Sequence, residues 1–402
     1  MLVTFRFKNF GPFKEEAVLD MRAVKEYKEH LDNVISEYED TPILKVASIY
    51  GANASGKTHV VEAYAAFLRI IKDSFRQKDK EDSESVLEEY YAPYLFDEAS
   101  ASACTEFEAV FLDGNYELRY GFVYDDVEIE YEWLYQTDII SKQTHVILER
   151  EGNHIEFGDL VKESCEKYLD DIDSEVLVLS FMSSLKLNTN VFARTLTNAG
   201  LFLPIFLSAD DWANVLLRRY WEKDFDEAEK PKLLSFLNGI DVGICDIKVE
   251  KKGKSVEIHT YHRDNDGDLI PVPISIESDG TRRAIALYSV LRVTAQFGGG
   301  LIVDEFHSQL HPLLQKYLLD LFYEKSTQGQ LIYTTHDTSL LDKKYVRRDQ
   351  VWFVEKNDQG EASLYSLDDF LIRNDDSFSV DYLGGVYGAI PKLKDFSFGE
   401  GS

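Results

Sequence analysis

The sequence predicts a mixed α/β fold whose parallel core sheet is assembled from both ends of the chain. Bounded apolar runs predict buried strands at Ile43–Tyr50, Gly300–Val303 and Gln330–Thr334. Residues 107–157 instead alternate apolar and polar side chains around short turns, which is the pattern of an antiparallel meander. The Leu-rich residues 159–240 between these regions favour helices.

Length and composition limit the class of protein. The chain has 402 residues, enough for two or three lobes around more than one core. Hydrophobic residues make up 44% of it and aromatic residues 13%, which predicts a globular chain. No apolar run approaches the roughly 20 residues that span a bilayer, and residues 1–10 alternate like a strand and lack a secretory signal. The three cysteines lie far apart, as in a reduced cytosol, so we expect a cytoplasmic protein with no membrane partner.

The charge balance is strongly acidic. The formal net charge is −29 and the sequence pI is about 4.7. This weighs against a general nucleic-acid coat, which needs clustered Lys and Arg to displace counterions. A local basic groove stays possible, so nucleic-acid binding is left open. The simplest interpretation of the charge is solubility.

The first ninety residues predict two strands, a buried strand and a helix. Val3–Phe7 and Ala17–Met21 are short strands joined by a turn at residues 9–12. After the buried run, apolar residues recur at helical spacing from Thr58 to Phe75. Residues 76–89 are highly charged and favour a loop or an exposed helix end.

The rest of the chain alternates between strands and helices. Asp113-Gly114-Asn115 and Glu151-Gly152-Asn153 are the turn signals of the meander. Later elements are expected at Val242–Lys251 (strand), Ser255–Arg263 (strand), Thr281–Phe297 (helix), Gly300–Val303 (strand), Pro312–Glu324 (helix), Gln330–Thr334 (strand), Gln350–Glu355 (strand) and Ala362–Ser366 (strand). No heptad run is long enough for an extended coiled coil.

The segment GANASGKT, Gly51 to Thr58, is a phosphate-binding loop of the form G-x-x-x-x-G-K-T. It stands between a predicted strand and a predicted helix, where its glycines let backbone N–H groups close around phosphate oxygens. Lys57 is expected to reach the β- and γ-phosphates, and Thr58 to ligate Mg²⁺. The residues predicted to bind nucleotide here are Gly51, Asn53, Ala54, Ser55, Gly56, Lys57 and Thr58.

Two carboxylates end the apolar strand in GGGLIVDEFHSQLHP, residues 298–312. A phosphate-binding loop needs a metal-binding carboxylate on a neighbouring strand, and Asp304 is the candidate for Mg²⁺. Glu305 is then placed to orient or deprotonate the attacking water. A strand with charged residues at its solvent end would look the same, and the loop upstream is what favours the catalytic interpretation.

Two further elements follow the same order. LIYTTHD, residues 331–337, is an apolar strand that ends in His336, whose imidazole could sense a γ-phosphate. ESDGTRRAIAL, residues 277–287, places Ser278 and Gly280 immediately before a predicted helix, which suits an anion. Alone, each has a simpler explanation: a surface histidine, and an ordinary helix cap at Ser278.

The order of the four motifs resembles the ABC-type ATPases of the RecF/SMC branch. It is closest to the small AAA-family ATPases related to the ATPase part of the OLD proteins, and FRFKNFGPF at the N-terminus and VDYLGGVYGAIP at 380–391 also resemble this group. The resemblance implies an ABC-ATPase head with a β-rich N-terminal part, a helical lobe, a P-loop core sheet and no long coiled coil. It divides the chain into 1–158, an ATP-binding lobe with the β meander, 159–240, a helical lobe, and 241–402, which completes the ATPase core.

The resemblance also implies the site and its partners. ATP and Mg²⁺ are the expected ligands, with Lys57, Thr58 and Asp304 in the roles above, Glu305 on the water and His336 on the γ-phosphate. Ser278 and Gly280 would act on the nucleotide of a second copy, in a homodimer or higher homo-oligomer, and Ser308–His311 falls in the place of the D-loop. Such ATPases accompany a nuclease or toxin in bacterial anti-phage modules, so a protein effector encoded nearby is expected.

Departures from the pattern keep an alternative open. DNA-repair relatives carry a basic residue where this chain has Gly11, no Q-loop glutamine can be placed, and no acidic cluster with nuclease spacing follows His336. The alternative is a RecF-like ATPase that binds DNA in repair or recombination. An ABC transporter motor is set aside because the meander does not suit it.

Weaker signals are assigned simpler roles. Asp264–Asp268 lacks the Gly and Glu of a calcium loop and predicts a hairpin turn. His307 and His311 share zinc-like spacing, but Ser308 stands where a zincin has Glu. Phe202 and Phe206 are interpreted as core aromatics of the helical stretch.

Overall fold

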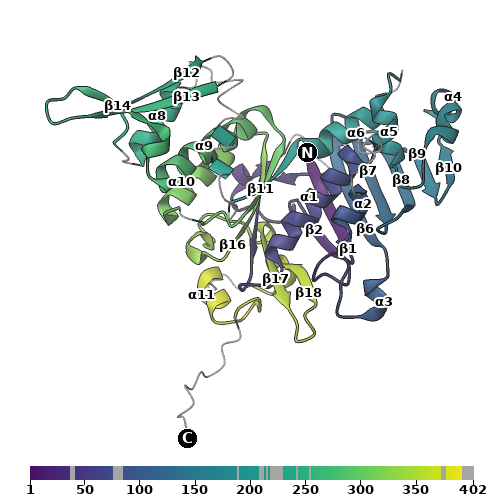
Figure 1. Ribbon diagram of the computed structural model, residues 1–402. Coiled ribbons are helices and arrows are strands. Elements are labelled where there is room, and N and C mark those ends of the chain that lie inside the picture. Colours follow the sequence, from purple (N-terminus) through teal and green to yellow (C-terminus); the bar gives the residue numbers. More distant parts are fainter. Residues whose placement is uncertain are drawn as a thin grey trace, which may run out of the picture.

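A computed structural model of the chain gives the fold (Figure 1). The structure describes residues 1–36, 41–75, 85–187, 190–207, 212–213, 216–217, 230–240, 243–252, 255–308, 310–372 and 377–391. The predicted charged stretch lies mostly outside the described residues, and so does Gln309 in the D-loop segment. Within the described ranges, no helix combines the length and the apolar character needed to cross a membrane.

A six-stranded sheet forms the core, in the order β11-β15-β16-β5-β17-β18. Its strands are β5 (Val46–Tyr50), β11 (Phe202–Phe206), β15 (Gly300–Asp304), β16 (Gln330–Thr335), β17 (Val351–Lys356) and β18 (Ala362–Ser366). All neighbouring pairs are parallel except β17 with β18. Both faces are covered, because alternate residues such as Leu301 and Ile302 pack into different hydrophobic cores. The predicted sheet, assembled from both ends of the chain, is confirmed.

A seven-stranded antiparallel sheet lies beside this core, in the order β10-β9-β8-β7-β6-β1-β2 (Figure 1). Its strands are β1 (Leu2–Lys8), β2 (Ala17–Asp20), β6 (Thr105–Asp113), β7 (Tyr116–Tyr124), β8 (Ile129–Asp138), β9 (Thr144–Glu151) and β10 (His154–Phe157). The two predicted hairpin turns hold, since Gly114 and Gly152 adopt φ of +60° and +54°.

Helix α1 (Lys57–Asp73) is buried between the two sheets (Figure 1). Its aromatic side chains pack on the antiparallel sheet, as in the contacts of Tyr64 with Phe5 and of Phe67 with Phe122. The helix also contacts β11 and β15 of the core sheet. A helix that is apolar on most of its circumference is stable only in such a buried position. This packing fixes the start of α1, and hence the phosphate-binding loop, against the core sheet.

Helices α9 (Asp279–Phe297) and α10 (Pro312–Tyr323) pack on the opposite face of the core sheet. A three-stranded sheet of β12 (Asp246–Lys252), β13 (Ser255–Arg263) and β14 (Leu269–Pro273) extends away from them (Figure 1). The predicted turn at Asp264–Asp268 joins β13 to β14. On β13, His262 contacts the Glu277 carboxylate at 2.7 Å, which ties this small sheet to the residue before Ser278.

The remaining elements are short. They are β3 (Val34–Ile35), β4 (Ile43–Leu44), α2 (Val86–Tyr90), α3 (Glu98–Ala101), α4 (Lys162–Cys165), α5 (Val178–Ser184), α6 (Val191–Gly200), α8 (Lys230–Gly239) and α11 (Phe378–Leu383). Short 3₁₀ helices occur at Leu31–Asn33, Glu166–Asp171, Ile274–Ile276, Thr338–Leu340, Arg348–Gln350 and Leu367–Asp369. Helix α11 covers the end of β17 through Phe378 and Tyr382.

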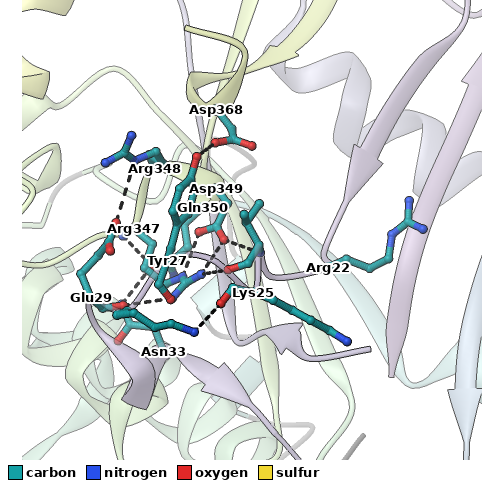
Figure 2. A network of polar contacts seen from close by, with 12 residues as sticks. Arg22, Lys25, Tyr27, Glu29, Asn33, Arg347, Arg348, Asp349, Gln350 and Asp368 are labelled. Atoms are coloured by element: carbon teal, nitrogen blue, oxygen red, sulfur yellow. Dashed lines mark hydrogen bonds and ion pairs between the residues drawn. The ribbon is translucent and has the colours of Figure 1, made fainter. Parts of the chain in front are cut away.

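A polar network with a buried centre joins residues 24–33 to residues 347–368 (Figure 2). At its centre Arg347, only 1% exposed, donates to both carboxylate oxygens of Asp349 at 2.9 and 2.7 Å. The same guanidinium donates to the carbonyls of Val24, Tyr27 and Glu29. The second carboxylate oxygen of Asp349 also accepts from the Val24 N–H at 2.8 Å. One ion pair therefore holds the early segment against the late one.

Two details differ from the predictions. The run Ile43–Tyr50 is not one strand: Ile43–Leu44 pairs with β3, and only Val46–Tyr50 enters the core sheet. The break is at Lys45, whose buried ammonium donates to the Glu324 carbonyl at 2.7 Å. The predicted mostly helical segment 159–240 also contains β11, which pairs with β15 at the edge of the core sheet. The division into three lobes stays a prediction.

Candidate nucleotide-binding site

The loop between β5 and α1 adopts a backbone that requires glycine at two positions. Gly56 has φ of +114°, and a Cβ there would lie 3.1 Å from the Pro12 side chain. A Cβ on Gly51 would lie 2.5 Å from the Val354 carbonyl oxygen. Ala54, at the exposed tip beside Asn53, has φ of +62°. The loop is thus held tightly at both ends and exposed in the middle, where a phosphate could approach.

The Lys57 ammonium is buried and bonded only to its own loop in the contacts that the structure describes. Its Nζ donates to the carbonyls of Gly51 and Ala52, both at 2.8 Å. Burial lowers the pKa of Lys57, and the nearby Asp304 and Glu305 carboxylates act in the opposite direction. Close by, the Ser55 hydroxyl is buried without a hydrogen-bond partner among the described residues. An ammonium whose described acceptors are two neutral carbonyls and an unsatisfied hydroxyl fit a triphosphate in this loop.

Asp304 and Thr58 form the oxygen pair expected for a metal. Asp304 is 1% exposed, and its Oδ2 accepts from the Thr58 hydroxyl at 3.1 Å. Its Oδ1 accepts from the Thr334 hydroxyl at 2.6 Å, which restrains the orientation of the carboxylate. Hard oxygen ligands of this kind suit Mg²⁺. The residues therefore fit the metal that the sequence predicted.

Glu305 adopts an uncommon backbone conformation. Its φ is +53°, which is rare for a residue with a side chain and costs of order 1–3 kcal/mol. The Glu305 N–H donates to the Thr334 hydroxyl at 2.8 Å, so Thr334 holds both carboxylate residues in place. At this residue the chain leaves the extended conformation of β15. Glu305 is half-buried, and its carboxylate is close enough to Lys57 to raise the pKa of the ammonium.

His336 does not stand alone at the end of β16. Its ring lies 3.7 Å from the ring of His307, measured between centroids. His307 belongs to the loop after β15, and its Nδ1 is 3.1 Å from the Thr335 hydroxyl. The sequence paired His307 with His311 as a weak zinc signal, whereas the structure pairs it with His336. The parallel register that sets Val303 opposite Tyr333 brings the two loops together.

Ser278 caps helix α9. Its hydroxyl accepts from the Thr281 N–H at 3.1 Å, so the simpler explanation of this motif is present in the structure. Gly280 lies inside the first turn of α9 and not before the helix as predicted. Both residues line a cavity of about 610 Å³ together with His311, whose Nδ1 accepts from the Leu313 N–H at the start of α10. Their contact with a nucleotide stays a prediction.

Three helices have their N-termini at the same end of the core sheet, where the parallel strands have their carboxyl ends. Helices α1 and α10 follow the carboxyl ends of β5 and β15. Helix α9 begins at this end too, because Arg283 in its second turn donates to the carbonyl of Leu207, just past β11. Helix N-termini carry partial positive charge. The phosphate-binding loop therefore lies at the same end of the core sheet as two further helix N-termini.

Gly11 has a structural reason. Its φ is +56°, and a Cβ there would lie 2.4 Å from the ring of His59 on α1. The His59 ring therefore fills the space that a side chain at position 11 would need. The basic residue expected from DNA-repair relatives cannot be accommodated here without moving His59.

The chain is similar to known proteins in its fold and in its sequence profile. Two solved structures are similar: the SMC head domain from Thermotoga maritima, with 11% identity and a TM-score of 0.41 over 91% of this chain and 98% of that one, and an SMC head bound to the C-terminal winged-helix domain of ScpA, with 14% identity and a TM-score of 0.42 over 91% and 97%. No curated protein sequence matches. The profile described as "AAA domain, putative AbiEii toxin, Type IV TA system" matches residues 46–342. Because this match covers most of the chain, from β5 past His336, the protein belongs to that family of AAA domains.

Proposed function

We propose that this protein binds and hydrolyses ATP with Mg²⁺ and works as a dimeric conformational switch on a partner effector, a nuclease or toxin, in bacterial anti-phage defence. The observation that carries the ATPase assignment is the meeting of Lys57, Thr58 and Asp304 at one sheet edge. These residues come from distant parts of the chain. A chance arrangement would not place a buried ammonium, a hydroxyl and a buried carboxylate in this order around a glycine loop.

Each residue has a task in this proposal. Lys57 exchanges two loop carbonyls for oxygens of the β- and γ-phosphates, which are stronger acceptors because they are charged. Thr58 and Asp304 would hold Mg²⁺, which neutralises charge on the phosphate oxygens. Glu305 orients or deprotonates the attacking water, and its strained backbone fixes where the carboxylate points. His336 contacts the γ-phosphate, and this contact is lost when hydrolysis removes that phosphate.

A second copy would complete the site. Ser278 and Gly280 lie at the same sheet edge as the phosphate-binding loop but border a separate cavity. In a face-to-face dimer the positive end of α9 would reach the γ-phosphate of the opposite copy. Closure is then favoured only while that phosphate is present, so hydrolysis opens the dimer.

The proposed effector is suggested by the family to which the chain belongs. The description of the matching family names a toxin and a TA system. Ligand-driven opening and closing of two copies is a suitable way to restrain or release a protein that binds both. Co-purification of the tagged chain with the products of neighbouring genes, with and without ATP, tests whether such a protein exists. If only the chain itself is recovered under both conditions, the effector proposal fails.

Glu305→Gln is expected to slow ATP hydrolysis by about 10²–10⁴-fold, the usual contribution of a general base. The amide keeps the size of the side chain and can still lie near the water, so ATP affinity should change little. The measurements are phosphate release at saturating ATP and the dissociation constant of ATP. Glu149→Gln, on the distant strand β9, is the control. Unchanged turnover in the Glu305 variant would remove its catalytic role.

Mixing two inactive variants is expected to restore activity if the site is shared between copies. Ser278→Asp keeps an acceptor for the Thr281 N–H but places a carboxylate where the phosphate of the other copy should lie. Lys57→Ala loses its own nucleotide. A mixed dimer has one intact site, and an equal mixture should regain about a quarter of wild-type turnover. Ser278→Asn keeps the cap without the charge and serves as the control. No recovery on mixing, with both variants folded, would place the site within one copy.

A further inference from the structure

His307 and His336 form a contact that the proposed catalytic roles do not use. Their ring centroids lie 3.7 Å apart and their planes are inclined by 58°. His336 is exposed at the end of β16, whereas His307 is half-buried in the loop after β15. An exposed imidazole without a neighbour samples several rotamers. Here the ring of His307 lies against one side of the His336 ring and limits the rotamers that His336 can adopt.

Thr335 holds the ring of His307 in place. The Thr335 hydroxyl accepts from the Asp337 N–H at 3.0 Å and lies 3.1 Å from His307 Nδ1. A hydroxyl can both donate and accept, so this contact forms with either neutral tautomer of His307. Thr335 therefore fixes the orientation of His307.

His307 is neutral at the pH of a cell. Burial, together with the nearby His336 and Lys57, lowers the pKa of His307 to about 4, although Asp337 acts in the opposite direction. A neutral ring can pack against His336 without repelling a proton on it. A neutral His307 also adds no second positive charge beside Lys57.

The surrounding groups anchor this pair to α10. Asp337 accepts from the side chain of Gln315 at 3.1 Å, and the same Gln315 amide donates to the Leu310 carbonyl. Gln315 is 1% exposed. The loop that carries His307 and the loop that carries His336 are therefore joined twice, once through Thr335 and once through Gln315. A rigid support of this kind is what a group needs if it must meet a ligand in one geometry.

We propose that His307 is a positioning residue, which holds the His336 ring in the orientation that meets the γ-phosphate of ATP. This inference rests on the proposed function. It assigns no direct contact between His307 and the nucleotide. Loss of His307 would leave His336 present but free to rotate, and a small misplacement of a reacting group costs as much as about 10²-fold in rate.

Three substitutions separate the ring contact from the hydrogen bond. His307→Phe keeps a ring against His336 and loses the hydrogen bond with Thr335. His307→Asn keeps a hydrogen-bonding group near the position of Nδ1 and loses the ring. His307→Ala loses both. We expect kcat to fall about tenfold or more for Ala and Asn but only about threefold for Phe, with KM for ATP within about threefold of wild type. His154→Ala, which removes an exposed histidine paired with Glu156, is the matched control.

A double-mutant cycle tests whether His307 acts through His336. Once His336→Ala has removed the sensor, His307→Ala should reduce kcat no further, because there is no ring left to position. Equal losses of kcat in both backgrounds would overturn the inference, as would an unchanged kcat in His307→Ala alone. If the wild-type protein does not hydrolyse ATP, or His336→Ala has no effect, the proposed function fails and not only this extension.

A nuclear magnetic resonance measurement gives a readout that does not depend on activity. The imidazole signals of His336, in protein with labelled histidines and without nucleotide, should move in His307→Ala and His307→Asn because the neighbouring ring is gone. They should stay closer to wild type in His307→Phe. His336 signals that are the same in all variants would show that the two rings are independent in solution and would overturn the inference.

Discussion

Lys57→Ala is expected to abolish measurable ATP binding. The ammonium is already desolvated inside the loop, so the cost of its desolvation is met before the nucleotide arrives, and charged phosphate oxygens then replace two neutral loop carbonyls as its acceptors. Two hydrogen bonds to a charged acceptor contribute about 3–6 kcal/mol, which raises the dissociation constant about 10²–10⁴-fold. Titration calorimetry with ATP and Mg²⁺ measures it directly.

Lys57→Ala is not expected to destabilise the nucleotide-free protein. Because burial without an anionic hydrogen-bond partner disfavours the charged lysine, Lys57→Ala should not lower the Tm of the nucleotide-free chain. ATP at 100 times its dissociation constant should stabilise the wild type by about 2.7 kcal/mol and the variant not at all. Arg69→Ala removes an exposed cation from the same helix and should behave like wild type. Tight ATP binding by Lys57→Ala would exclude the loop as the nucleotide site.

Arg347→Met is expected to destabilise the fold by about 3–5 kcal/mol, the typical cost of leaving one charge of a buried pair without its partner. Among the described contacts Asp349 would keep the Val24 N–H, while three carbonyls of residues 24–29 would each lose the guanidinium as a donor. The free energy of unfolding from urea titration measures the effect. Arg22→Ala, which breaks an exposed pair with Asp20, should cost about 1 kcal/mol or less.

Adding Asp349→Asn to Arg347→Met should recover part of this loss, because the buried charge disappears while an acceptor for Val24 remains. A loss below about 1 kcal/mol in the single variant would mean that water replaces the guanidinium, and the network of Figure 2 would then be a surface feature.

Local patterns predicted most of the sheet and the phosphate-binding loop. β5, β15 and β16 are apolar runs with clear ends, and the glycine loop has a fixed spacing. Strand β11 was not predicted, because Phe202–Phe206 is short, contains Pro204 and lies in a Leu-rich stretch. A proline cannot donate to a sheet neighbour and is tolerated on an edge strand, which is the place β11 takes.

The polar networks were beyond sequence reasoning. Arg347 and Asp349 are two residues apart, but their partners lie more than 300 positions earlier, and nothing local marks them as buried. The pairing of His307 with His336 depends on the strand register, because parallel neighbours with Val303 opposite Tyr333 bring the residues just past each strand together. The register itself is set by tertiary packing and could not be derived from the pattern.

The position of β5 has a consequence for synthesis of the protein. β5 is made early, yet both of its neighbours, β16 and β17, come from beyond Gln330. At about 5–20 residues per second the ribosome needs on the order of 15–60 s to supply them. During that time an apolar strand has two unpaired edges, a state prone to aggregation. A truncated chain that keeps the whole glycine loop but ends before β16 should therefore neither fold nor bind nucleotide.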